Sequence, residues 1–152
     1  MSTDKWICFL LCTGILARED LRTRHISLMT ASAGALCGAL ITGAEIITGT
    51  EEAGAVLQHL TALLWGLGLL LLSRLSRGAI GKGDGLCFCS FACWWNAAEL
   101  FTLLLVSLVL SGTGGAVLLF LKKRSLKGSV PFLPFVFAAA LILFVLSLCA
   151  GA

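Results

Sequence analysis

The chain has 152 residues, of which 59% are hydrophobic and only 12% are charged, and its mean hydropathy is +1.01. A soluble domain has about 25% charged residues, so this composition excludes an ordinary soluble protein and indicates a membrane protein. The chain is too short to hold a sizeable soluble domain beside several membrane spans. The net charge of +3 is small, and we expect the lipid bilayer, not nucleic acid, as the surrounding partner.

Apolar segments follow one another along the chain, separated by short charged or glycine-containing breaks. The first three cover residues 6–17 (3–19 if it is to cross a bilayer), 26–47 and 53–72. Residues 85–121 are too long for one span, and Trp94-Trp95-Asn96 with Glu99 predicts a tight turn among them, with the paired Trp side chains at the membrane interface. The last segment begins near residue 130. The sequence therefore predicts an all-α protein, a polytopic bundle of six transmembrane helices forming a single domain over residues 1–152.

Basic residues indicate the orientation of this bundle. Every Lys and Arg except Lys5 lies in one of three segments, which follow the first, third and fifth predicted helices: Arg18, Arg22 and Arg24; Arg74, Arg77 and Lys82; Lys122, Lys123, Arg124 and Lys127. The charged residues of the other two loops are all acidic, namely Glu45, Glu51, Glu52 and Glu99. The positive-inside rule then places the basic segments in the cytoplasm and both termini outside.

Two aspartates lie at the predicted cytoplasmic edge of the bundle, where a charge near lipid is costly and often functional. Asp20 ends the first predicted helix and Asp84 begins the fourth, so helix packing could bring them together. Alternatively, each could pair with a neighbouring arginine or cap a helix, and Asp84 could be an N-cap residue. Gly81 and Gly83 precede Asp84 and would let an extended substrate approach the backbone and add as a strand.

Three segments together resemble a known family. Gly81-Lys82-Gly83-Asp84 matches the GxGD motif of intramembrane aspartic proteases. Residues 20–26 (DLRTRHI) resemble the first aspartate, basic segment and isoleucine of the prepilin peptidase (type IV leader peptidase) branch, and residues 131–135 (PFLPF) its proline-aromatic motif at the start of the last span. The resemblance covers nearly the whole chain. It departs from the family at Ser27 and Leu28, where Pro-Asn is common, and at Leu86, where Lys is frequent.

The resemblance implies a membrane-embedded aspartic endopeptidase of a bacterial-type cytoplasmic (inner) membrane. It would remove the basic leader of a prepilin or pseudopilin at the cytoplasmic membrane face. Asp20 and Asp84 would be the catalytic dyad that activates water, with either one holding the shared proton. No metal or other cofactor is implied, and no methyltransferase activity, because residues 18–25 contain no cysteine. The substrate-binding residues would be the two motif glycines and the start of the last span: Gly81, Gly83, Pro131, Phe132 and Pro134.

Other interpretations of the same residues stay open. A small ion- or proton-coupled transporter or channel component would also contain membrane carboxylates, although near the bilayer midplane. A catalytically inactive assembly subunit of a pilus or secretion system would keep the fold without the activity. The seven cysteines lie in apolar stretches and are interpreted as packing residues. On a helix Cys87 points away from the face shared by Cys89 and Cys93, which disfavours a metal site.

Overall fold

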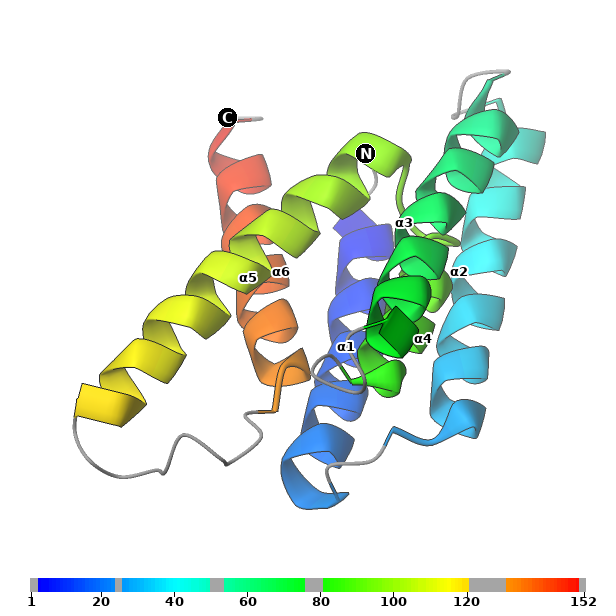
Figure 1. Ribbon diagram of the computed structural model, residues 1–152. Coiled ribbons are helices and arrows are strands. Elements are labelled where there is room, and N and C mark those ends of the chain that lie inside the picture. The colour runs from blue at the N-terminus through cyan, green and yellow to red at the C-terminus, as the bar shows by residue number, and fades with distance from the viewer. Residues whose placement is uncertain (1–2, 24–25, 50–53, 76–80, 121–130, 151–152) are drawn as a thin grey trace.

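The computed structural model describes residues 3–23, 26–49, 54–75, 81–120 and 131–150 (Figure 1). This part of the chain forms six helices: α1 (Thr3–Thr23), α2 (Leu28–Ile47), α3 (Ala55–Leu75), α4 (Lys82–Phe91), α5 (Ala97–Phe120) and α6 (Leu133–Ala150). Several charged loop residues that indicate the orientation of the bundle lie outside the described ranges, namely Arg24, Glu51, Glu52, Arg77, Lys122, Lys123, Arg124 and Lys127.

The all-α prediction is confirmed, and the helices support a membrane protein. Within the described residues, three helices are long and apolar enough to cross a membrane: α2, α3 and residues 97–117 of α5. Helix α6 is apolar but shorter. Helix α4 has 10 residues, which corresponds to about 15 Å at the usual rise per residue. A hydrocarbon core is about 30 Å thick, so α4 does not cross it alone, and the helix lengths do not establish six full spans.

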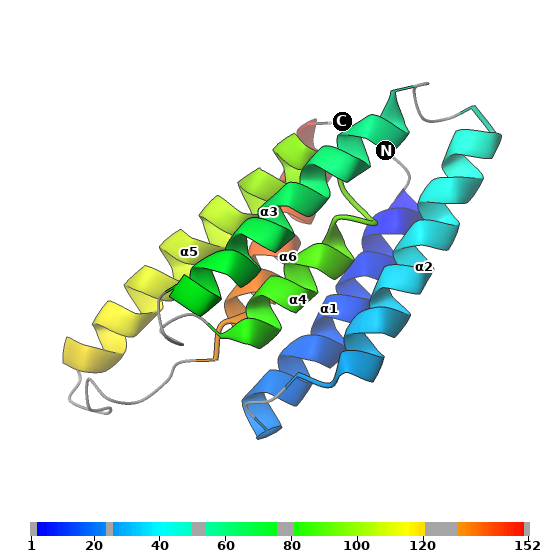
Figure 2. The ribbon, with the colours of Figure 1, turned by 45° about the vertical axis from the view of Figure 1, so that its right-hand side comes forward.

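The short helix α4 lies in the middle of the bundle. It packs against α3 on one side and α2 on the other, while α6 packs against α1 and α5 (Figure 2). Its buried residues include Phe88 and Phe91. On the outside of the bundle, by contrast, leucines such as Leu40 of α2 and Leu64 of α3 are largely exposed. Such an apolar outer surface is unusual for a monomeric soluble protein and fits a lipid environment.

The predicted turn between α4 and α5 is confirmed, and its tryptophans pack inside the bundle. Trp94 and Trp95 are 1% and 3% exposed, so both are buried in the bundle. Trp94 donates its indole N–H to the carbonyl of Gly34 at 2.9 Å. A Cβ on Gly38 would lie 2.5 Å from the Trp94 ring. This burial was not predicted, and it arises because the small residues of α2 leave a groove in which Trp94 packs; a position at the level of the membrane interface stays a prediction.

The start of α5 explains why the chain turns at this point. Glu99 accepts a hydrogen bond from the Asn96 N–H (3.2 Å), and Asn96 accepts one from the Glu99 N–H (3.0 Å). This reciprocal pair is a capping box, which satisfies two backbone donors at a helix N-terminus. The polar residues that indicated a turn in the sequence thus begin the next helix.

Candidate functional site

Asp20 joins the end of α1 to the beginning of α6. Its side chain is buried, with 7% of the residue exposed, and its Oδ2 accepts a hydrogen bond from the Leu133 N–H at 3.1 Å. Leu133 is the first residue of α6, where backbone N–H groups have no partner within the helix. The next residue, Pro134, has no N–H, and the Phe135 N–H bonds the Phe132 carbonyl at 3.0 Å. Asp20 is therefore the acceptor for the first donor of α6, in a position that the helix dipole also favours.

Asp84 lies in the first turn of α4, but not at its N-cap. The N-cap is Gly81, so the alternative that made Asp84 the N-cap residue is wrong. The Asp84 carboxylate accepts a hydrogen bond from the Gly81 backbone N–H, and the Asp84 N–H bonds the Gly81 carbonyl at 3.2 Å. This bond from a third-position acid back to the N-cap N–H is one half of a capping box. Glycine provides no side chain for the other half.

The two aspartates influence each other electrostatically. Asp84 precedes the apolar part of α4 and lies outside the three long membrane-spanning helices. Burial, and next the negative charge of Asp20, raise the pKa of Asp84 from 3.8 to about 6, while the Gly81 N–H opposes this shift. The structure thus places Asp20 and Asp84 within interaction range, although they belong to helices far apart in the sequence. Two neighbouring carboxylates do not ionise independently, and one of them tends to keep a proton.

The motif glycines have structural reasons that need no substrate. A Cβ on Gly83 would lie 2.5 Å from Cδ1 of Ile26, so the missing side chain lets Ile26 pack against the start of α4. A Cβ on Gly81 would lie 2.9 Å from Oδ2 of Asp84. Glycine at these positions therefore brings Ile26 and the Asp84 carboxylate close to the α4 backbone. Approach of a substrate to the same backbone stays a prediction.

The segment before α6 contacts α4 as well as α1. The ring of Phe132 stacks on Phe88, with centroids 6.4 Å apart and an interplanar angle of 30°. Phe88 follows Asp84 by one helical turn and is fully buried. Pro131 and Pro134 are partly exposed. Of the predicted substrate contacts in this segment, Phe132 thus has a partner within the chain, and the two prolines are accessible.

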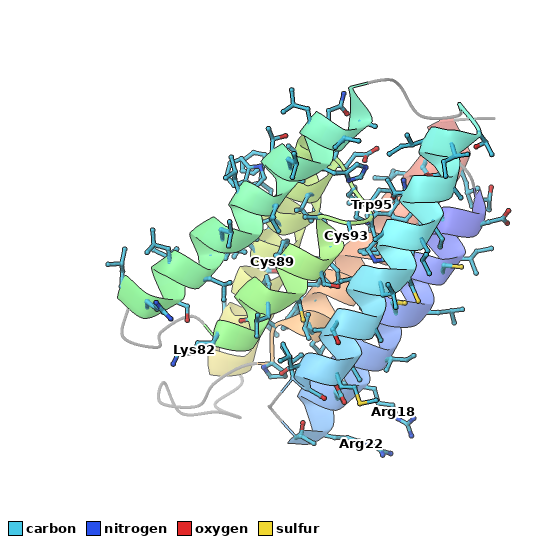
Figure 3. All side chains as sticks on the ribbon, turned by 90° about the vertical axis from the view of Figure 1, so that its right-hand side faces the viewer. Arg18, Arg22, Lys82, Cys89, Cys93 and Trp95 are labelled. Carbon is cyan, nitrogen blue, oxygen red and sulfur yellow. The ribbon has the colours of Figure 1, made fainter. Side chains whose placement is uncertain are left out.

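Basic side chains lie at the aspartate end of the bundle. Figure 3 shows Arg18, Arg22 and Lys82 at this end, and all three are exposed. Glu19 accepts a hydrogen bond from the Thr30 hydroxyl at 2.6 Å, which ties α1 to the start of α2. No pattern in the sequence indicated this contact, because Thr30 is one of many small polar residues in the chain.

A buried ion pair lies at the opposite end and was not predicted. Lys5 of α1, which is 2% exposed, contacts Glu45 of α2 with 2.7 Å between Nζ and Oε2. The ammonium group also lies 5.7 Å from the centroid of the Trp95 ring. One signal could have revealed the pair: Lys5 is the basic residue outside the three basic segments, and Glu45 ends an otherwise apolar segment on the same predicted side.

No protein-family model, curated protein or solved structure matches the chain. Among the described residues, no group of three or more His, Cys, Asp or Glu side chains is arranged to hold a metal ion. Fold and site together define the class: an all-helical membrane protein with two electrostatically coupled aspartates at one end of its bundle.

Proposed function

We propose that this chain is a membrane-embedded aspartic endopeptidase of the prepilin-peptidase type, which removes the basic leader of a prepilin or pseudopilin. One observation carries the proposal: Asp20 and Asp84 lie close enough that, after burial, the charge of Asp20 is the next cause that raises the pKa of Asp84 to about 6. A pair of carboxylates that share one proton is the arrangement with which aspartic proteases activate water.

In this mechanism the two carboxylates have different tasks. We assign the proton to Asp84, because burial and the charge of Asp20 raise its pKa, and the negative charge to Asp20, because it accepts the Leu133 N–H at the start of α6. Asp20 then acts as the base: it takes a proton from water while the water oxygen attacks the carbonyl carbon of the scissile peptide bond. Asp84 donates its proton to the carbonyl oxygen. The tetrahedral intermediate breaks down when Asp20, now protonated, gives its proton to the nitrogen of the leaving peptide, the C–N bond breaks, and Asp84 takes a proton back from a hydroxyl group of the intermediate.

The proposal includes a topology of six membrane crossings, with the aspartates at the cytoplasmic face and both termini outside. It rests on the basic segments of the sequence and on the exposed positions of Arg18, Arg22 and Lys82. The fourth crossing would consist of residues 85–96, which are the part of α4 after Asp84 and the turn that follows it, because α4 alone is too short. In this topology the leader would meet the aspartates from the cytoplasm.

The proposal is tested by co-expressing the chain with candidate prepilins from the same genome and measuring leader removal by mass. We expect Asp84→Asn to abolish cleavage, since an amide can neither hold the dyad proton nor donate it as an acid. Lys82→Ala is the matched control in the same motif, because its exposed side chain contributes little to the dyad. Full cleavage by Asp84→Asn, at a membrane level equal to that of the unchanged chain, would refute the proposal.

One observation favours a second candidate, a catalytically inactive assembly subunit. The hydrogen bond from Leu133 to Asp20 stabilises the start of α6 whether or not the chain cleaves anything. In such a subunit both aspartates would be structural, and their substitution would change stability without any effect on prepilin processing. Asp20→Asn and Asp20→Ala separate these candidates, because only in a peptidase does each substitution abolish prepilin processing.

A further inference from the structure

One face of α1 is exposed along the length of the helix. Residues that recur every three or four positions share one side of a helix, and five such residues of α1 are exposed: Ile7, Leu11, Ile15, Arg18 and Arg22. The three apolar side chains among them are 47%, 64% and 58% exposed. The buried residues of α1, such as Phe9, Leu16 and Asp20, point elsewhere. The exposed face is therefore an apolar stripe that ends in two arginines.

The two arginines of this stripe are free to bind an anion. Arg18 and Arg22 are four residues apart, so their guanidinium groups reach the same point beside the helix. Within the described residues neither forms an ion pair, because the salt bridge found there joins Lys5 and Glu45, and Figure 3 shows both arginines extending away from the ribbon. Like charges at this spacing repel each other. An anion between them would relieve the repulsion.

The charge and shape of the face select its ligand. A ligand that covers the stripe must be apolar along most of its length and negatively charged at the end near Arg18 and Arg22. A basic leader peptide has the wrong charge for the arginines, and a free phosphate leaves Leu11 and Ile15 uncovered. An anionic phospholipid has both parts, and the planar guanidinium group of arginine suits a phosphate group.

We propose that the exposed face of α1 binds an anionic phospholipid such as phosphatidylglycerol. Its acyl chain lies along Leu11 and Ile15, and its phosphate group lies between Arg18 and Arg22. The carboxyl end of a helix has a partial negative charge, so the attraction for the phosphate comes from the arginines and not from the end of α1. This site depends neither on the two aspartates nor on the proposed peptidase function.

A tryptophan placed on the stripe reports which lipid lies there. Trp65→Phe removes the 41% exposed tryptophan and leaves three buried ones, and Ile15→Trp in this background adds a lipid-facing reporter seven residues before Arg22. The full chain is reconstituted in vesicles of phosphatidylcholine with a small mole fraction of phosphatidylglycerol, and the acyl chains of one of the two lipids are brominated. Quenching of the reporter, after subtraction of the background variant, gives the affinity for phosphatidylglycerol relative to phosphatidylcholine. We expect a preference of about 25-fold at low salt, because each basic residue near the membrane surface strengthens the binding of anionic lipid about fivefold.

A charge-matched variant tests the part played by the arginines. Arg22→Gln should lower the preference about fivefold. Lys82→Gln is the control, because it removes one exposed positive charge at the same end of the bundle from another helix (Figure 3), and it should leave the preference unchanged. Equal effects of the two substitutions would overturn the proposal.

A second reporter tests whether the preference is local to α1. Leu36→Trp replaces Ile15→Trp for this purpose, because Leu36 is 62% exposed and lies at a similar distance from the aspartate end of α2, a helix without Lys or Arg. We expect little preference there. The same preference at both reporters, or none at the reporter on α1, would overturn the proposal. So would a reporter on α1 that neither brominated lipid quenches, because a second copy of the chain would then cover this face. Leu11→Trp, one turn earlier on the stripe, replaces Ile15→Trp if that variant does not fold.

Discussion

Asp20 has two tasks in the proposed enzyme, and two substitutions separate them. As a catalytic base it takes a proton from water, and as a structural residue it accepts the Leu133 N–H at 3.1 Å. Asn at this position keeps an oxygen that accepts this hydrogen bond but cannot act as the base. Ala removes both the base and the acceptor. It leaves the N–H of Leu133, a residue that is 1% exposed, without its acceptor.

The expected losses of stability differ between the two variants. A hydrogen bond to a charged group contributes about 1.5–3 kcal/mol, and a neutral one about 0.5–1.5 kcal/mol. Asp20→Asn should therefore cost about 1 kcal/mol, partly offset because the repulsion between Asp20 and Asp84 disappears. Asp20→Ala leaves a buried donor unsatisfied, which costs about 1–3 kcal/mol. We thus expect Asn to be the more stable variant and both to be inactive.

The assay combines unfolding and cleavage in the same detergent. The free energy of unfolding is measured for the unchanged chain, Asp20→Asn and Asp20→Ala, and leader removal is measured at a temperature where all three are folded. Cleavage by the Asn variant would refute the catalytic task of Asp20. Equal stability of Asn and Ala would instead refute its capping of α6. If the unchanged chain and both variants cleave none of the candidate prepilins, the result would favour the assembly-subunit candidate.

Three further predictions concern Asp84 and the glycines. The folded-state pKa of Asp84 is raised from 3.8 to about 6, so the protonated carboxyl group stabilises the fold fully below pH 4, and this stability is lost as the pH rises through about 6. In a profile of melting temperature against pH, Asp84→Asn should therefore flatten the fall between pH 4 and 7. Gly83→Ala should destabilise the fold because its Cβ would lie 2.5 Å from Ile26, and Ile26→Ala should rescue stability in the double variant; absence of rescue would indicate another cause. Gly66→Ala places a Cβ 2.5 Å from the α4 backbone and should cost about 1–3 kcal/mol in unfolding, whereas Gly68→Ala, with open space around it, should be neutral or slightly stabilising.

Hydropathy predicted the helices and their order well, because apolar runs of sufficient length have few alternatives in lipid. It located the ends less well. Helix α1 continues to Thr23, beyond the apolar run that ends at residue 17, since backbone hydrogen bonding can extend a helix through charged residues. The burial of Trp94 was missed for a related reason. Hydropathy gives the depth of a residue in the bilayer, whereas the groove that receives Trp94 depends on Gly38 of another helix.

The aspartates were found from sequence, but the capping contact of Asp20 was not. Asp84 belongs to a recognisable motif, and Asp20 occupies the end of an apolar segment on the same predicted side. The acceptor role of Asp20 toward α6 involves the backbone N–H of Leu133, and every residue except proline has such a donor. No pattern of side chains could therefore have indicated which helix Asp20 contacts.

The three segments that carry the family resemblance contact one another in the structure. Ile26 packs on Gly83, Asp20 accepts the N–H of Leu133, and the charge of Asp20 raises the pKa of Asp84. Each contact alone is ordinary helix packing or capping. Together they hold two carboxylates between the ends of three helices, where their like charges oppose folding. This cost is understandable if the pair does chemistry, which supports the peptidase proposal over an inactive subunit.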